Sequence, residues 1–240
     1  MHWRTLVDDP ADGAWNMALD EALLEAHRLG LSGPTLRLYR WATPTLSLGY
    51  AQRFTAEQQT RWRAEGASLV RRPTGGRAVV HAHDFTYSVV TSGLPLRITS
   101  SYEALSQGVI GALRLLGLEA GLGQGQAHGT RSASCFASAT PADLIAAGQK
   151  LCGSAQVRRQ GAVLQHGTMY LDEAPQWAWL PEQPPVQSLA GLLGRKVSWE
   201  MVAEAFMKGF SSAFPGTWES GAITAWERNR ALEHQERFRL

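Results

Sequence analysis

The sequence is poor in cysteine, in lysine and in long apolar runs, and each shortage excludes a class of protein. Two cysteines, Cys135 and Cys152, cannot build a disulfide framework, and no Cys/His spacing typical of a zinc site surrounds them. No apolar run reaches the roughly 18 residues of a membrane-spanning helix. The opening residues MHWRTLVDDP lack the apolar core of a secretion signal. We therefore expect a cytoplasmic protein with no membrane partner.

The net charge is too small for a protein that coats a polyanion. Lys and Arg number 23 against 21 Asp and Glu, which gives a formal net charge of +2. This balance argues against nucleic acid as a partner. Lysine occurs only at Lys150, Lys196 and Lys208, so arginine supplies the other 20 basic residues. Because an amine exchanges its proton far more readily than a guanidinium does, a lysine within a motif is a candidate for chemistry.

With 240 residues and 44% hydrophobic content, the chain can bury a full core. We expect one domain over residues 1–240, with its core at about 3–180 and a helical extension at 188–240. Apolar residues recur at helical spacing, or capping residues begin a polar helix, in five segments. These predicted helices lie at 12–29, 55–65, 101–116, 198–210 and about 223–238. Residues 181–187 are too rich in proline for a helix and read as a connector.

Strand patterns alternate with these helices. The predicted strands lie at 35–41, 45–50, 68–72, 77–81, 85–91, 142–147, 150–159 and 162–171. Gly148-Gln149 and Gln160-Gly161 separate the last three, which predicts a meander of two hairpins. On a regular strand Lys150, Cys152 and Ser154 then share one face. Residues 121–134 are rich in Gly, Gln and Ser, so we expect a mobile loop that leads to Cys135.

The segment from Ser68 to Thr91 carries the first candidate binding site. Its Pro73-Thr74-Gly75-Gly76 turn lies between two strand-like runs, and paired glycines allow backbone N–H groups to approach a ligand closely. Arg71, Arg72 and Arg77 place cationic donors beside this turn. The combination suits a carbonyl, carboxylate or phosphate group. The alternative is a simple hairpin, which is what a Gly-Gly turn between strands usually forms.

Cys135 is the better of two candidate nucleophiles. It lies among small polar residues in SASCFAS, after the predicted loop, whereas Cys152 in KLCGSAQ has the surroundings of a small buried hydrophobe. A thiol becomes a nucleophile as its thiolate, and a nearby cation increases that fraction. The alternative for either residue is an inert intracellular cysteine.

Histidines and a carboxylate also cluster after the glycine turn. His81 and His83 share a strand face and stand beside Asp84, but no third metal ligand accompanies them, so we expect no metal site. His166 in LQHGT is open to either a structural or a functional reading.

Several segments taken together resemble the cofactor transferase family of biotin and lipoate protein ligases. They are NMALDEALL at 16–24, TLSLGYAQ at 45–52, RRPTGGRAVVH at 71–81, Cys135-Phe136, GQKLCGSAQ at 148–156 and LQHGT at 164–168. The similarity covers about residues 3–172 and is greatest to the octanoyltransferase branch, in which a Cys-Phe pair is present. The resemblance implies an α/β (α+β) fold with a central mixed, largely antiparallel sheet flanked by helices.

The resemblance also implies which residues form the site. In this family the cysteine carries the acyl group and the lysine of the GxKxxGSA motif contacts its carbonyl, which implies Cys135 and Lys150 as catalytic residues. The implied substrate-binding residues are Arg71, Arg72, Thr74, Gly75, Gly76, Arg77, His81, Gly153, Ser154 and Ala155. One departure is that Ala82 stands where the family usually has Asp after the histidine, and the next carboxylate is Asp84.

The implied reaction moves an octanoyl group from octanoyl-acyl carrier protein, through a thioester on Cys135, to a lysine of a lipoyl domain such as the glycine cleavage H protein. Exchange between thioesters followed by amide formation requires no ATP and no cofactor. The acceptor amine must be neutral to attack, and His81, His83 and Lys150 are all candidate bases. The alternatives are an ATP-dependent lipoate ligase, an amidotransferase between lipoyl domains, and a non-catalytic acyl- or biotin-binding module.

Overall fold

A computed structural model describes residues 1–123, 143–180 and 187–240, and it contains two sheets with helices outside them. The helices are α1 (Gly13–Arg28), α2 (Ala56–Ala64), α3 (Ile98–Leu115), α4 (Leu189–Leu193), α5 (Trp199–Ala213) and α6 (Ala225–His234). The strands are β1 (His2–Val7), β2 (Thr35–Tyr39), β3 (Thr45–Leu48), β4 (Ser68–Arg71), β5 (Val79–His81), β6 (Asp84–Ser92), β7 (Ala120–Leu122), β8 (Leu144–Ala146), β9 (Gln149–Arg159), β10 (Ala162–Tyr170) and β11 (Thr217–Ser220). Two short 3-10 helices lie at Pro175–Trp179 and Gln235–Phe238.

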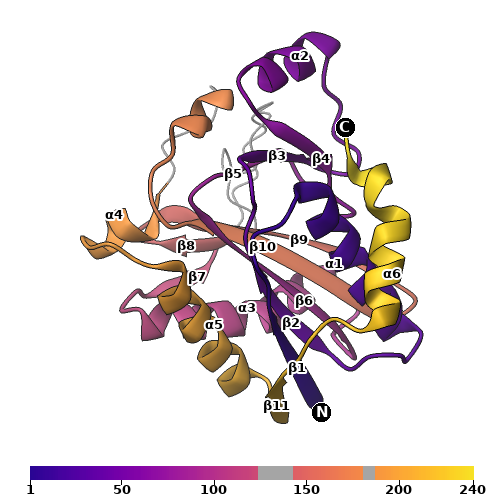
Figure 1. The fold of residues 1–240 in the computed structure, drawn as a ribbon. Coiled ribbons are helices and arrows are strands. Elements are labelled where there is room, and N and C mark those ends of the chain that lie inside the picture. Colours follow the sequence, from indigo (N-terminus) through magenta and orange to yellow (C-terminus); the bar gives the residue numbers. More distant parts are fainter. Residues whose placement is uncertain (124–142, 181–186) are drawn as a thin grey trace.

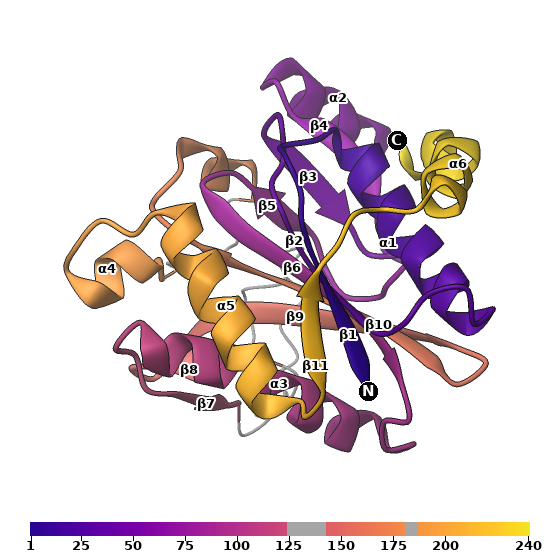
Figure 2. The same ribbon diagram turned by 60° about the horizontal axis from the view of Figure 1, so that its bottom comes forward.

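The large sheet is mixed and mostly antiparallel, as predicted. Its strand order is β11-β1-β2-β6-β10-β9-β8-β7, and only the pairs of β1 with β11 and with β2 are parallel. Helices α3 and α5 cover one face, and α1 with α6 covers the other (Figures 1 and 2). The sheet therefore separates two hydrophobic cores, and the candidate site lies on the α1 side.

The small sheet places the glycine turn against the large one. Its order is β4-β3-β5, with β4 parallel and β5 antiparallel to β3. The turn at 73–76 therefore connects strands on opposite sides of β3, and the simple hairpin alternative is wrong. A Cβ added at Gly49, just after β3, would lie 1.9 Å from the Gly76 carbonyl oxygen. Only glycine permits this close approach, which packs the turn onto the end of β3.

Helix boundaries follow the caps that the sequence predicts. Asp12 accepts a hydrogen bond from the Ala14 N–H at 2.8 Å and begins α1. Thr55 and Gln58 form the predicted capping box of α2, and Ser198 caps α5. Such local signals act within one helical turn, which is why they can be recognised without the tertiary structure.

The predicted meander is confirmed, with one shift. Strands β8, β9 and β10 are antiparallel neighbours. The first turn lies at Ala147-Gly148 rather than at Gly148-Gln149, because Ala147 and Gly148 both have positive φ, at 48° and 75°. This is the combination that a two-residue hairpin turn of type I′ requires. Three strands were not predicted: β1, β7 and β11. Strand β7 includes Gly121 and Leu122, at the start of the predicted loop.

Within the described residues, no helix combines the length and apolar character needed to cross a bilayer.

Helices α3 and α5 cross at glycines, and the crossing tests how tightly the first core is packed. A Cβ added at Gly209 of α5 would lie 2.4 Å from the Ala112 nitrogen and 2.5 Å from the Gly108 oxygen of α3. Gly209→Ala must push the helices apart, and we expect a loss of about 1–3 kcal/mol in the free energy of unfolding, measured by urea denaturation. Exposed Ser212 on the same helix provides the matched control, Ser212→Ala. Equal urea midpoints for the two variants would contradict this packing.

Candidate active site

A narrow cavity lies between α1 and the strands of the large sheet. Its walls come from α1, from β2 and the residues after it, from the small sheet, and from β6, β9 and β10. The lining includes Met17, Tyr39, Trp41, Arg72, His81, Thr86, Gly153, Ser154, Ala155, His166, Gly167 and Thr168. The β9 wall is formed by the small residues Gly153, Ser154 and Ala155. The volume of the cavity is about 30 Å³, room for about one water molecule.

A buried carboxylate, Asp20 of α1, lies behind this cavity. It accepts hydrogen bonds from Arg37 Nη1 at 2.8 Å, Ser88 Oγ at 2.7 Å and Tyr39 Oη at 3.0 Å. Burial alone would raise the pKa of Asp20, but the Arg37 charge and the hydrogen bonds from His166 and Ser88 outweigh it, so the pKa is lowered. Asp20 is therefore an anion in the interior of the protein.

His166 connects this carboxylate to the glycine turn. Its Nδ1 lies 3.1 Å from Asp20 Oδ2, and its Nε2 lies 2.6 Å from Thr74 Oγ1. An ionised carboxylate only accepts hydrogen bonds, so Nδ1 carries the hydrogen and, in the neutral imidazole, Nε2 accepts from the Thr74 hydroxyl. The hydrogen bonds that connect Asp20, His166 and Thr74 fix the position of the glycine turn next to the cavity.

Arg72 hydrogen-bonds carbonyl groups of the glycine turn and of the adjacent strand β3. Its guanidinium donates to the carbonyl oxygens of Ser47 at 2.7 Å, Gly75 at 3.0 Å and Arg77 at 2.8 Å. Arg71 lies farther out, and its Nη1 donates to the carbonyls of Gly49, Tyr50 and Gln52. The rigid fork of arginine suits such multiple bonds, so both arginines organise the backbone around the turn.

His81 forms a second His–carboxylate pair across the cavity. Its Nδ1 lies 2.7 Å from Asp84 Oδ2, and its Nε2 lies 2.8 Å from Ser47 Oγ. The Trp41 ring stacks on the His81 ring, with 3.8 Å between the ring centroids. His83 has φ of +53°, and this left-handed residue turns the chain so that Asp84 points back at His81. Burial lowers the pKa of His81 although Asp84 opposes the shift. A carboxylate thus accompanies the histidine despite Ala82.

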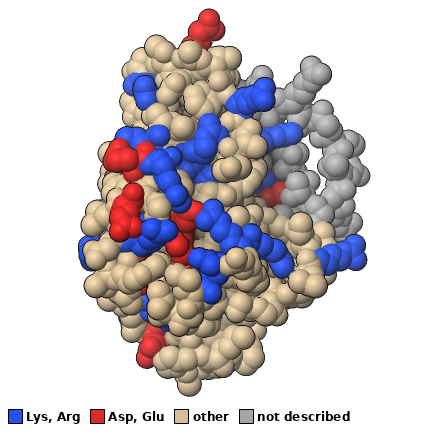
Figure 3. All heavy atoms as spheres, turned by 90° about the vertical axis from the view of Figure 1, so that its right-hand side faces the viewer, with Lys and Arg blue, Asp and Glu red and all other residues tan. Residues whose placement is uncertain are grey.

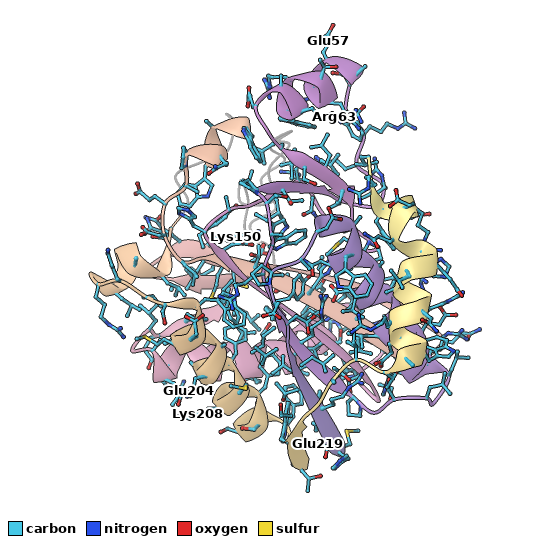
Figure 4. The ribbon with its side chains drawn as sticks, viewed as in Figure 1. Glu57, Arg63, Lys150, Glu204, Lys208 and Glu219 are labelled. Carbon is cyan, nitrogen blue, oxygen red and sulfur yellow. The ribbon has the colours of Figure 1, made fainter. Side chains whose placement is uncertain are left out.

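Lys150 lies at the start of β9 and near the middle of the view in Figure 4. Its Nζ is 2.9 Å from Asp143 Oδ1, and both side chains are buried. Cys135, the predicted nucleophile, lies outside the described residues. Cys152 is fully buried, and its Sγ lies 3.9 Å from Ser154 Oγ, so these two share a face as predicted.

The family whose model matches residues 12–211 is described as "Lipoyl protein ligase A/B catalytic domain". Two relatives match nearly the whole chain. Octanoyltransferase LipM of Kyrpidia tusciae is 40% identical over 262 residues, which cover 98% of this chain and 96% of the relative. Octanoyltransferase LipM of Symbiobacterium thermophilum is 37% identical over 254 residues, which cover 96% and 93%. The chain belongs to the lipoyl protein ligase A/B family.

Solved structures agree with this assignment. A lipoate protein ligase from T. acidophilum with bound lipoic acid has a TM-score of 0.84 and 28% identity, covering 99% of this chain and 96% of that one. A lipoate-protein ligase A bound with ATP has a TM-score of 0.80 and 28% identity, covering 98% and 95%. The predicted family and fold are confirmed.

In this lipoyl ligase fold, some of the predicted site residues meet and others do not. Five line the cavity: Arg72, His81, Gly153, Ser154 and Ala155. Thr74 touches the cavity wall through His166, whereas Arg71 lies in a hollow on the outer side of the turn. The roles of these residues, and of Gly75, Gly76, Arg77, Cys135 and Lys150, stay predictions. The described residues hold no group of three His, Cys, Asp or Glu side chains placed to bind a metal ion.

Sequence reasoning passed over the residues behind the cavity. Asp20 and Asn16 stand four residues apart on the apolar face of α1, where polar side chains are out of place, and this spacing was the available signal. Arg37 stands inside a strand whose five residues are all buried, which was a second signal.

The Asp20 network predicts a measurable dependence of stability on one carboxylate. Among the described residues, Asp20→Asn leaves the buried Arg37 charge with Asp8 as its one anionic partner, and we expect a loss of about 3 kcal/mol in the free energy of unfolding by urea. Because the folded pKa of Asp20 is lowered, its contribution is present above its ordinary pKa near 4 and is lost as the pH falls through the lowered value. The gap between wild type and variant should therefore narrow below about pH 4.

The matched control is Glu204→Gln, which removes one partner of an exposed ion pair with Lys208 on α5. This variant should keep the urea midpoint of the wild type, because both side chains are solvated. If Asp20→Asn did the same at neutral pH, the ionised network would be wrong.

Proposed function

We propose that the chain carries octanoyl groups from octanoyl-acyl carrier protein to a lysine of a lipoyl domain, such as the glycine cleavage H protein, through a thioester on Cys135. The observation that carries this proposal is the convergence of Arg72, His81 and the Gly153-Ser154-Ala155 segment on one cavity beneath the glycine turn. Lys150 lies on the same strand, β9, three residues before Gly153. The lipoyl-domain acceptor is supported by the relatives, which are named as LipM octanoyltransferases and lipoate ligases.

The activity itself is the one predicted: the chain is an octanoyltransferase of lipoate biosynthesis. Relatives with this name are 36 to 40% identical to it over most of its length. The finer features of the proposal are the covalent step, the donor and the acceptor.

The covalent step balances without an added energy source. The Cys135 thiolate attacks the thioester carbonyl, its C–S bond to the carrier breaks, and the carrier thiolate leaves with one proton from solution. The two thioesters are similar in energy, and attack by a lysine amine then yields the more stable amide and returns the cysteine. No cofactor takes part.

Lys150 is suited to stabilise the tetrahedral oxyanion in both steps. A buried ammonium is costly unless it is paired, and Asp143 supplies the countercharge at 2.9 Å. This pairing fixes a positive charge in a site with little water, where it acts strongly on a developing negative charge. Backbone N–H groups of the glycine turn are the second set of donors, which Arg72 positions from the carbonyl side.

The acyl chain requires the cavity to widen. A volume of about 30 Å³ does not hold eight carbons, so side chains of the wall must move when the substrate enters. Met17 is the most adaptable member of the wall, because its unbranched side chain has three rotatable bonds.

His81 is the best-placed base for the acceptor amine. Its lowered pKa keeps it neutral near pH 7, and Asp84 fixes the tautomer in which Nε2 has the lone pair. The entering amine would replace Ser47 as the donor to Nε2. His83 hydrogen-bonds the Glu173 carbonyl at the exposed outer surface, and Lys150 is occupied by Asp143.

The ATP-dependent ligase is the second candidate, because neighbouring structures are named as lipoate ligases, with lipoic acid or ATP bound. A ligase requires free acid and ATP, whereas the proposed transfer requires neither. The acyl donor that the protein uses, free acid with ATP or octanoyl-acyl carrier protein, therefore distinguishes the two functions.

Intact-protein mass spectrometry tests the covalent step. After mixing with octanoyl-acyl carrier protein in the absence of ATP, the wild type should gain one octanoyl group on Cys135, which added lipoyl domain removes. Cys135→Ser should gain no thioester and lose at least about 10³-fold in transfer rate. Cys152→Ala, which removes the buried cysteine, is the matched control and should still acylate. An adduct on any other residue, or transfer only with free acid and ATP, would rule out the mechanism.

The pH dependence of the second half-reaction tests His81. Asp84→Asn removes the carboxylate that raises the pKa of His81, so this pKa should fall further and the acid limb of the rate profile should move to lower pH. Weaker orientation of the ring should also slow transfer to the lipoyl domain by about 10²-fold. Acylation of Cys135 should keep its rate, and His83→Asn should match the wild type in both steps. An unchanged profile in Asp84→Asn would exclude His81 as the base.

A further inference from the structure

Arginine side chains gather on the face of the molecule that carries α1 and α6 (Figure 3). Two hollows of about 500 and 370 Å³ lie there, and they share Glu21, Arg159 and Arg237 as lining residues. Together they form one groove, here called the arginine groove. Its arginines are Arg28, Arg71, Arg72, Arg159, Arg230 and Arg237.

The arginine groove has a surplus of positive charge. Its six arginines stand against Glu21 and Glu25 in the lining and against Glu233, which pairs with Arg230, so three positive charges are in surplus. The formal net charge of the whole chain is +2. The surplus positive charge of the chain can therefore be assigned to this groove.

The groove is preorganised for an anion. Glu21 is buried and accepts from both Arg159 and Arg237, which holds their guanidinium groups side by side. Each of these arginine side chains is nearly half exposed, at 46% and 49%, and a guanidinium has five N–H donors. Donors that face solvent therefore remain after Glu21 is satisfied, in a fork geometry that matches phosphate and carboxylate groups.

The groove also adjoins the candidate active site. Arg72 lines both the 370 Å³ hollow of the groove and the cavity of the candidate active site. The two spaces therefore lie on either side of one side chain at the glycine turn. A flexible arm anchored in the groove would reach the cavity past this turn.

A third hollow, of about 400 Å³, adjoins the cavity from the other direction through Trp41 and His81. Its lining includes one arginine, Arg40, and one carboxylate, Asp84, so it has no surplus of positive charge. The two approaches to the cavity therefore differ in charge, which allows two protein substrates to be told apart.

We propose, on the basis of the function above, that the arginine groove docks the acyl donor: an acidic carrier protein whose thioester arm is attached through a phosphodiester. Both the acidic surface and the phosphodiester are anionic, so both gain from the surplus charge. The acceptor presents a lysine whose proposed base, His81, lines the other hollow. The acceptor lysine is therefore assigned to the side of Trp41 and His81.

The experiment measures binding of dye-labelled holo-acyl carrier protein by fluorescence anisotropy at low salt. Arg159→Gln and Arg237→Gln each leave Glu21 one arginine partner, and each should weaken binding about three- to tenfold. Adding about 0.3 M salt should weaken binding of the carrier protein to the wild type by a similar factor. Lys208→Gln removes the same charge from α5, far from the groove (Figure 4), and should bind as the wild type.

Kinetics on two donors test the same surface during turnover. KM for octanoyl-acyl carrier protein should rise in the groove variants, whereas KM for the lipoyl domain and for octanoyl-pantetheine, which has neither protein nor phosphate, should change less than about twofold. If the Arg159 and Arg237 variants do not fold, Arg28→Gln is the variant to test in their place. The Arg28 guanidinium lies 3.8 Å from Glu25, and Glu25 still pairs with Arg230 when Arg28 is replaced.

The outcomes separate the docking site from the proposed function. Groove variants that bind the carrier as tightly as the wild type would overturn the docking site while leaving octanoyl transfer intact. So would weakened binding of the lipoyl domain instead of the carrier, or an equal effect of Lys208→Gln. Normal, arginine-dependent binding of the carrier without any octanoyl transfer would overturn the proposed function and leave the docking site standing.

Discussion

The buried Asp20 carboxylate is the interaction on which the site depends. It joins α1 to three strands that are distant in sequence: Arg37 and Tyr39 come from β2, Ser88 from β6 and His166 from β10. A charge in the interior is stable only when such partners surround it, so the carboxylate fixes the register of helix and sheet together. Replacing any one partner would remove a hydrogen bond from a buried ionised carboxylate.

The position of the glycine turn follows from this network. Thr74 is held by His166, whose other nitrogen is held by Asp20, while Arg72 gathers the carbonyls of Gly75 and Arg77. The turn that faces the acyl cavity is therefore placed by contacts with segments that are distant in sequence. Its geometry is a product of tertiary structure, although its glycines are evident in the sequence.

Arginine serves two purposes in this protein, and both use the fork geometry of the guanidinium group. Inside, Arg37 and Arg72 each bind several carboxylate or carbonyl oxygens, which a lysine ammonium cannot do in one plane. Outside, Arg159 and Arg237 are aligned by one buried carboxylate, Glu21. The scarcity of lysine is consistent with this use of the fork geometry, and it left Lys150 recognisable as the exception.

Local physics made much of the fold readable in advance. Caps at Asp12, Thr55 and Ser198 and the meander of β8 to β10 depend on residues within a few positions of each other, so the sequence alone determined them. It also determined the family, through RRPTGGRAVVH and GQKLCGSAQ. Strands β1 and β11 escaped notice because short strands are defined by their partners. The tertiary structure alone decided that β4 and β5 flank β3, that Asp84 turns back to His81, and that Asp20 faces Arg37. Each of these depends on contacts between segments far apart in the chain, and no local pattern records which distant groups will meet.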